Sequence, residues 1–184
     1  FVNHRGSDDL TVTNMESVST VISLDRISSA DTTSITFKNA ALAGTSDNVT
    51  VNVNRVTAAE NITLTSSGAN DIETVTINST GSVANIIGTL LVDDSANNDV
   101  MTKLVITGDQ DLDADAGDMD FAGTATTDTA TVDASGMSGT LLLDLDDADT
   151  NVRHDVTGGT GNDTFDMGDS LDANDTIDGG AGTD

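Results

Sequence analysis

Short segments in which apolar and polar residues alternate recur along almost the whole chain. In each of them apolar residues stand two positions apart, mostly across a Thr or Asn. The segments occupy 34–37, 49–53, 62–64, 75–77, 104–106, 130–132 and 141–145. A period of two with many β-branched residues predicts strands that bury one face. We therefore expect an all-β protein.

Three similar phrases lead into such strands, IETVTIN at 72–78, MTKLVIT at 101–107 and TDTATVD at 127–133. Their starts lie 29 and 26 residues apart, and a turn rich in Gly, Asp or Ser follows each one. This spacing indicates a loose internal repeat of one coil per unit, which predicts a β-solenoid (a parallel β-helix or β-roll). Small aliphatic residues suffice inside such coils, in keeping with only four aromatic residues, all of them Phe. A β-sandwich is the alternative for residues 1–92, where the two folds are evenly matched, whereas after residue 93 the solenoid is favoured.

Acidic residues are concentrated in the second half of the chain. Residues 1–92 hold 9 acidic and 4 basic residues, a net charge of −5, and residues 93–184 hold 23 and 2, a net charge of −21. All 23 are Asp, a poor helix former that suits turns and metal ligation. We therefore divide the chain into a Thr-rich β-strand region (1–92) and an Asp-rich β-solenoid (93–184). Disorder competes as an explanation of such charge, but the alternation argues against it for most of the chain.

The composition excludes several classes of protein. Without any Cys, the chain has no disulfide scaffold, thiol catalysis or Cys-based zinc site. The net charge of −26 disfavours binding to a nucleic-acid backbone and favours a cation as partner. The sequence contains no run of 18 apolar residues, so we expect no membrane-spanning helix. The motifs HExxH, G-x-S-x-G and G-x-x-x-x-G-K-[ST] are missing. A carboxylate pair for glycoside hydrolysis stays open, but the aromatic platform for a sugar is missing, so we expect no enzyme.

The strongest motif lies in residues 158–184. Residues 158–166 read GGTGNDTFD and fit the nonapeptide G-G-x-G-x-D-x-U-x, with Phe165 as the large apolar residue. Residues 167–178 hold a second copy with three additional residues and without the double glycine, and residues 179–184 (GGAGTD) begin a third. Asp163, Asp175 and Asp184 therefore occupy equivalent positions. Glycines allow tight curvature that turns carbonyl oxygens inward, and Asp adds an anionic oxygen, which together suit Ca²⁺.

These residues, with the phrases ITGDQDLDAD and TATVDASGMSGTLLLDL, resemble the RTX-type surface-layer proteins and related adhesins that Gram-negative bacteria secrete. In the RTX β-roll two nonapeptides form one coil, and turns one coil apart share an ion. The resemblance thus implies that the first and third copies stack across one Ca²⁺. A site around Asp169, Asp172 and Asp175 in the middle copy is doubtful. The candidate metal residues are Gly158, Gly159, Gly161, Asp163, Asp175, Gly179, Gly180, Gly182 and Asp184.

A second acidic run, Asp109, Asp111, Asp113 and Asp115, is less specific. Its strict alternation predicts one face of a strand, either as a solvated stripe or, with lower weight, as part of a second ion site. An EF-hand is rejected because Ala116 and Ala122 stand at positions six and twelve of the loop counted from Asp111. Asp144, Asp146, Asp147 and Asp149 are interpreted in the same way. Asp93, Asp94 and Asp99 form a weaker candidate loop site.

The resemblance also implies type I secretion, folding in external calcium and a place at the bacterial cell surface. We expect a calcium-dependent structural protein of an extracellular self-assembling layer or fibre, with strand edges at the solenoid ends as natural contacts. The alternative is an adhesin or binding module of a larger secreted RTX protein, holding a ligand such as a cell-surface polysaccharide. The chain opens at Phe1 without a signal peptide and stops within a repeat, so we expect it to be an excised piece.

Overall fold

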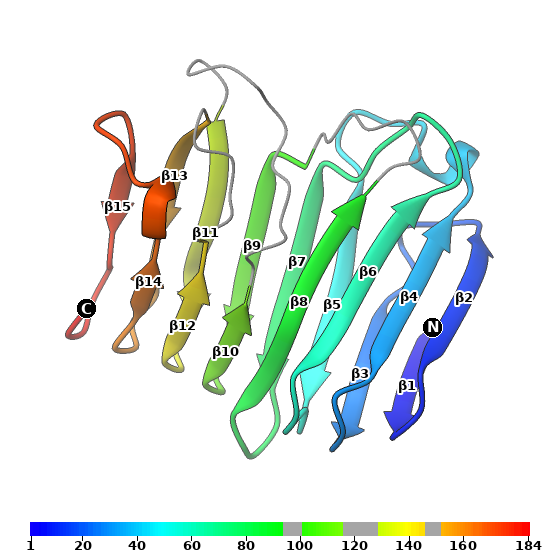
Figure 1. Cartoon of the computed structure of the whole chain (residues 1–184), viewed down its shortest axis with the longest axis horizontal. Helices are drawn as coiled ribbons and strands as arrows, with labels where there is room; N and C mark the ends of the chain where they lie inside the picture. The colour runs from blue at the N-terminus through cyan, green and yellow to red at the C-terminus, as the bar shows by residue number, and fades with distance from the viewer. Residues whose placement is uncertain (94–100, 116–128, 146–151) are drawn as a thin grey trace.

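The computed structural model describes residues 1–93, 101–115, 129–145 and 152–184. Its strands form two sheets that lie face to face (Figure 1). The chain passes back and forth between them, so odd-numbered strands lie in one sheet (sheet A) and even-numbered strands in the other (sheet B). One strand from each sheet makes one coil, and the coils stack side by side. The predicted all-β solenoid is confirmed.

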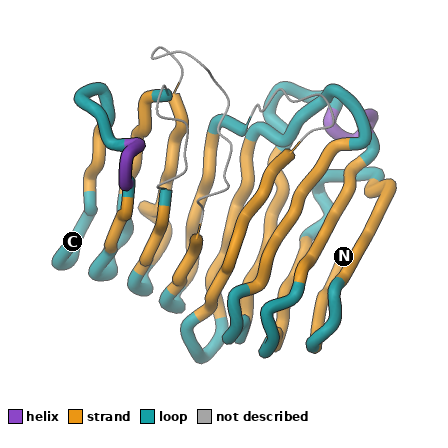
Figure 2. The backbone as a smooth tube through the Cα atoms, in the orientation of Figure 1, coloured by secondary structure: helices purple, strands orange, loops and turns teal. Residues whose placement is uncertain are grey.

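Sheet A consists of β1 (Val2–Gly6), β3 (Ile22–Ile27), β5 (Asn48–Asn54), β7 (Thr74–Thr80), β9 (Lys103–Gly108), β11 (Thr129–Met137), β13 (Arg153–Thr157) and β15 (Thr176–Asp178). Sheet B consists of β2 (Leu10–Met15), β4 (Thr32–Phe37), β6 (Glu60–Ser66), β8 (Asn85–Asp93), β10 (Leu112–Asp115), β12 (Leu141–Asp144) and β14 (Thr164–Asp166). Two short 3₁₀ helices, η1 (Asn39–Leu42) and η2 (Gly168–Ser170), lie in connections that lead from sheet B back to sheet A (Figure 2).

All neighbouring strands in the described part of the chain are parallel, including those within residues 1–92. Parallel neighbours need a crossover connection, and here the strand of the opposite sheet supplies it. The sandwich considered for residues 1–92 would consist of antiparallel sheets, so that interpretation is wrong. β8 continues sheet B past residue 92, so the change in charge there coincides with no break in the stack.

The strand register refines the predicted repeat. β7, β9 and β11 are successive strands of sheet A. Val75 lies opposite Leu104, a step of 29 residues that equals the spacing of the first two phrases. Leu104 in turn lies opposite Val132, a step of 28 residues, whereas the phrases suggest 26. Because side chains repeat with a period of two, this two-residue difference leaves the same face of the strand inside.

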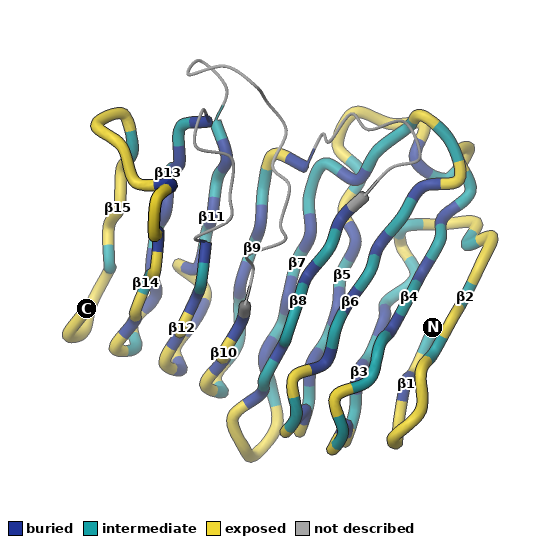
Figure 3. Tube along the Cα trace, in the orientation of Figure 1, coloured by how far each residue is buried: buried dark blue, intermediate teal, exposed yellow. Residues whose placement is uncertain are grey.

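Inward-facing side chains of both sheets form one continuous apolar core. Figure 3 shows the buried residues recurring along the strands of both sheets. The core consists almost entirely of Val, Ile, Leu, Met and Ala, because facing sheets only about 10 Å apart leave room for aliphatic side chains. Phe37 is the fully buried aromatic residue of the described chain, whereas Phe1 is 80% exposed. The core therefore forms with almost no aromatic residues, as the composition requires.

Connections from sheet A to sheet B lie along one edge of the solenoid, the lower edge in Figure 1. Five successive sheet A strands have a residue with positive φ at or next to this end: Gly6, Arg26, Arg55, Gly81 and Gly108. Gly108 has φ +126°, and a Cβ at this position would overlap the backbone of Ser79 in the neighbouring coil. Only glycine fits there, because close stacking and the backbone angle both exclude a side chain. The same edge carries the first and third glycine-rich turns.

Candidate metal centre

The first and third copies of the nonapeptide motif stack at the C-terminal end of the lower edge. β13 pairs with β15 in parallel, which brings the turn after each strand together. The Gly158 N–H donates to the Asp178 carbonyl oxygen (2.7 Å), and the Ala181 N–H donates to the Gly159 carbonyl oxygen (2.9 Å). The two turns are therefore direct neighbours, as the resemblance to the RTX β-roll implies.

The Asp that closes each turn binds backbone N–H groups. Asp163 is only 2% exposed, and its carboxylate accepts the N–H groups of Gly159 (2.8 Å) and Leu141 (3.0 Å). Asp184 Oδ1 accepts the N–H of Asp163 (2.8 Å). Asp163 thus closes its own turn and also holds that turn to the preceding coil. Asp184 holds its turn to the coil of Asp163 in the same way.

Oxygen atoms of both turns gather around the double glycines. A Cβ added at Gly158 would lie 3.0 Å from Asp163 Oδ2 and would overlap the Gly179 carbonyl oxygen, and one at Gly179 would lie 2.7 Å from Asp184 Oδ2. Glycine at both positions therefore lets the two turns approach so closely that their carboxylate and carbonyl oxygens come together. A carboxylate oxygen that accepts one N–H still has a lone pair for a hard cation. The donor set of these two turns thus fits Ca²⁺.

Asp175 of the middle copy lies on the opposite edge, in the connection from β14 to β15. Its Oδ1 accepts the N–H of His154 (2.7 Å), and its Oδ2 accepts the N–H of Asp172 (2.6 Å). All three closing Asp residues therefore accept an N–H from the preceding coil. Their equivalent positions in the repeat thus correspond to the same hydrogen bond in the structure. Asp175 does not join Asp163 and Asp184, because the two sheets separate the edges.

The second acidic run is divided between two settings. Only Asp113 and Asp115 belong to β10, whereas Asp109 and Asp111 lie in the turn before it. Asp111 Oδ1 accepts the N–H of Thr140 in the next coil (2.8 Å), and Asp113 is exposed on the outer face. The prediction that all four residues share one strand face is therefore wrong. The alternation of Asp continues from an extended turn into the strand, and only in the strand does it place side chains on one face.

The remaining acidic candidates do not form a cluster in the part of the chain that the structure describes. Asp144 lies on the outer face of β12, and Asp93 ends β8. Asp94, Asp99, Asp146, Asp147 and Asp149 lie outside the described residues. Within the described ranges, no three His, Asp or Glu side chains are grouped to hold a metal ion. The stacked turns, which would draw on backbone oxygens as well, are the candidate centre that the geometry supports.

A buried polar cluster at the other end of the solenoid escaped the sequence analysis. The Thr33 hydroxyl donates to Glu60 Oε1 (2.7 Å) and lies 2.6 Å from His4 Nδ1. His4 Nε2 lies 2.6 Å from the Asp8 carbonyl oxygen, so this nitrogen carries a proton and donates. Glu60 is fully buried, and its Oε2 has no hydrogen-bond partner among the described residues. The alternating pattern could have revealed this cluster, because it places the polar residues Thr33 and Glu60 on the inward face of their strands.

No family model, curated protein or solved structure matches this chain. In the described residues, no helix has the length and apolar character needed to cross a membrane.

Proposed function

We propose that this protein is a calcium-dependent structural component of a secreted, self-assembling layer or fibre at a bacterial cell surface, and that it has no enzymatic activity. One observation carries the proposal: two GGxGxD turns stack on each other and hold Asp163 and Asp184 on adjacent coils. Such a site would let external Ca²⁺ control whether the C-terminal coils assemble.

Electrostatics supplies the physical reason for this control. The second half of the chain has a net charge of −21, and parallel stacking aligns some of its acids. Asp144, for example, lies opposite Asp166 in the register of β12 and β14. Without a cation, repulsion between such carboxylates favours an expanded chain, which suits passage through a secretion channel. A cation that binds only the stacked turns adds its binding energy to folding.

Calcium titration of the purified protein tests the proposal. At a free calcium concentration about 100 times the dissociation constant, one site contributes about 2.7 kcal/mol. In a chain of this length that is a rise in melting temperature of about 5–10 °C. We expect EGTA to reverse the rise and magnesium not to reproduce it. Asp184→Asn should abolish it, whereas Asp113→Asn, an exposed control on β10 with the same change in charge, should retain it. Identical melting curves in calcium and EGTA would refute the role of calcium.

Self-assembly needs its own measurement. We expect calcium to convert the purified protein into sheets or filaments visible by electron microscopy, and EGTA to disperse them. A protein that binds calcium but sediments as a monomer at all concentrations would refute the self-assembling role and leave the calcium site intact.

A further inference from the structure

The outer face of sheet A gathers basic residues that are scarce in the rest of the chain. Three of the six Lys and Arg residues lie on it, and each is close to an Asp of the same face. Arg5 Nε donates to Asp25 (2.6 Å), Lys103 Nζ donates to Asp133 (2.9 Å), and Arg153 lies 3.9 Å from Asp155. In the described part of this face only Asp178 adds an acid without a basic neighbour on the face, so its net charge is −1.

Hydrogen bonds favour the ionised form of Asp133. The Ser135 hydroxyl donates to Asp133 Oδ1 (2.6 Å), and this bond, followed by that from Lys103, lowers the pKa of Asp133. Lys103 and Asp133 therefore contribute a pair of opposite charges that compensate each other on this face.

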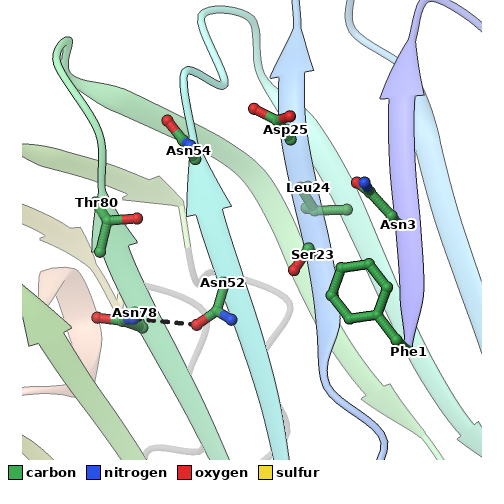
Figure 4. A pocket seen from close by; sticks show the side chains of 9 residues that line it. All are labelled: Phe1, Asn3, Ser23, Leu24, Asp25, Asn52, Asn54, Asn78 and Thr80. Carbon is green, nitrogen blue, oxygen red and sulfur yellow. Dashed lines mark hydrogen bonds between the residues drawn. The ribbon is translucent and has the colours of Figure 1, made fainter.

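Between the ion pairs, the outward positions of β5 and β7 are entirely uncharged. All of them are Asn or Thr, namely Asn48, Thr50, Asn52, Asn54, Thr74, Thr76, Asn78 and Thr80. Asn78 Nδ2 donates to Asn52 Oδ1 (3.0 Å), and Thr76 Oγ1 donates to Asn48 Oδ1 (3.1 Å). A shallow hollow runs across this face between Asn3 and Thr80 (Figure 4). These rows present hydrogen-bonding groups that are already held in place.

The outer face of sheet B differs in charge. Its described outward side chains include Asp113, Asp144 and Asp166 on three successive strands, with no basic side chain among them. Two copies of a chain with a net charge of −26 repel each other least where the facing surfaces carry paired charges or none. Sheet A offers such a surface along almost its whole length. The described outward positions of β4 and β6 in sheet B are also uncharged, but sheet B becomes acidic from β10 onward, so only sheet A stays free of unpaired charge from β1 to β13.

We propose that the outer face of sheet A, centred on β5 and β7, is the surface on which a second copy of this chain docks. This inference rests on the self-association in the proposed function. Four strands (β3 to β9) of about seven residues cover about 440 Å² on each copy. The resulting total of about 900 Å² is below that of most stable complexes, so one contact is weak and holds only where many copies repeat it. That property suits a lattice.

Single cysteines test the face, because the chain has none of its own. In calcium buffer and with a short bis-maleimide cross-linker, we expect Thr76→Cys or Asn52→Cys to give a covalent dimer. Thr63→Cys on β6 is the matched control, since Thr63 is also a half-buried, outward-facing Thr of a central strand, but in sheet B. Cross-linking at neither sheet A position above the Thr63→Cys level would overturn the inference.

A charge variant provides the second measurement. Thr76→Asp should weaken self-association by about tenfold in sedimentation experiments, because two like charges would meet across the contact. Thr63→Asp, with the same change in net charge, should leave it unchanged. Equal weakening by both variants would overturn the proposed face. Assembly that persists unchanged in Thr76→Asp would refute this docking face but not the structural role. Cross-linking at the Thr76 position that does not depend on calcium would refute calcium control but not the docking face.

Discussion

Replacement of Asp163 by Ala should open the C-terminal coils even without calcium. The carboxylate is 2% exposed and accepts two backbone N–H groups, one within its own turn and one from Leu141 in the preceding coil. Hydrogen bonds to a charged acceptor contribute about 1.5–3 kcal/mol each, and both donors would remain buried without a partner. We therefore expect a loss of about 3–5 kcal/mol, confined to nearby coils because each coil of a solenoid contacts only its neighbours.

Hydrogen exchange with mass spectrometry, performed in EGTA, measures this effect separately from any bound ion. Amides of β12, β13 and β14 should exchange about 100-fold or more faster in Asp163→Ala, while those of β3 to β7 should not change. Asp113→Ala is the control, because Asp113 is an exposed Asp on the outer face of β10 and its removal should change stability by less than about 0.5 kcal/mol. Unchanged protection of β13 and β14 would refute the conclusion that this carboxylate holds the turn together.

Three further predictions concern stability. Gly108→Ala should destabilise the protein by about 3 kcal/mol or more in urea unfolding, whereas Gly6→Ala, also at positive φ but with nothing within 4 Å of the added Cβ, should cost only about 1–2 kcal/mol; equal losses would contradict the role assigned to close stacking. Thr33→Val should cost about 1–3 kcal/mol, because it removes the hydroxyl that donates to buried Glu60, and an unchanged urea midpoint would show that the buried cluster contributes nothing. The pKa of Asp133 is lower in the folded protein than in the unfolded chain, so its contribution to stability is present above about pH 4 and disappears as the pH falls through the folded pKa. The stability advantage of wild type over Asp133→Asn should therefore shrink below about pH 4. An advantage that grows there would contradict the ion pair.

Local patterns were sufficient to predict seven of the fifteen described strands and the position of the candidate metal centre. The alternating segments at 49–53 and 75–77, for example, lie within β5 and β7. The resemblance of the glycine-rich repeats to the RTX β-roll likewise implied that the turns of Asp163 and Asp184 would meet. Both features act over a few residues or one coil, so the sequence displays them directly. The run from Asp109 to Asp115 shows where this fails, because an extended turn and a strand produce the same alternation.

What the sequence determined by itself was where about half of the strands lie, which side of each of those strands is apolar, and which Asp residues are equivalent. Only the tertiary structure decided that the strands within residues 1–92 are parallel coils and not an antiparallel sandwich, because pairing joins residues 20 or more positions apart and the local alternation is the same in both folds. It also decided that His4 and Glu60 meet in the core, and that the outer face of sheet A is almost neutral while that of sheet B is acidic along β10, β12 and β14. Charge counts along the chain cannot show this, since the side on which a charge lies depends on how each strand is placed in its sheet.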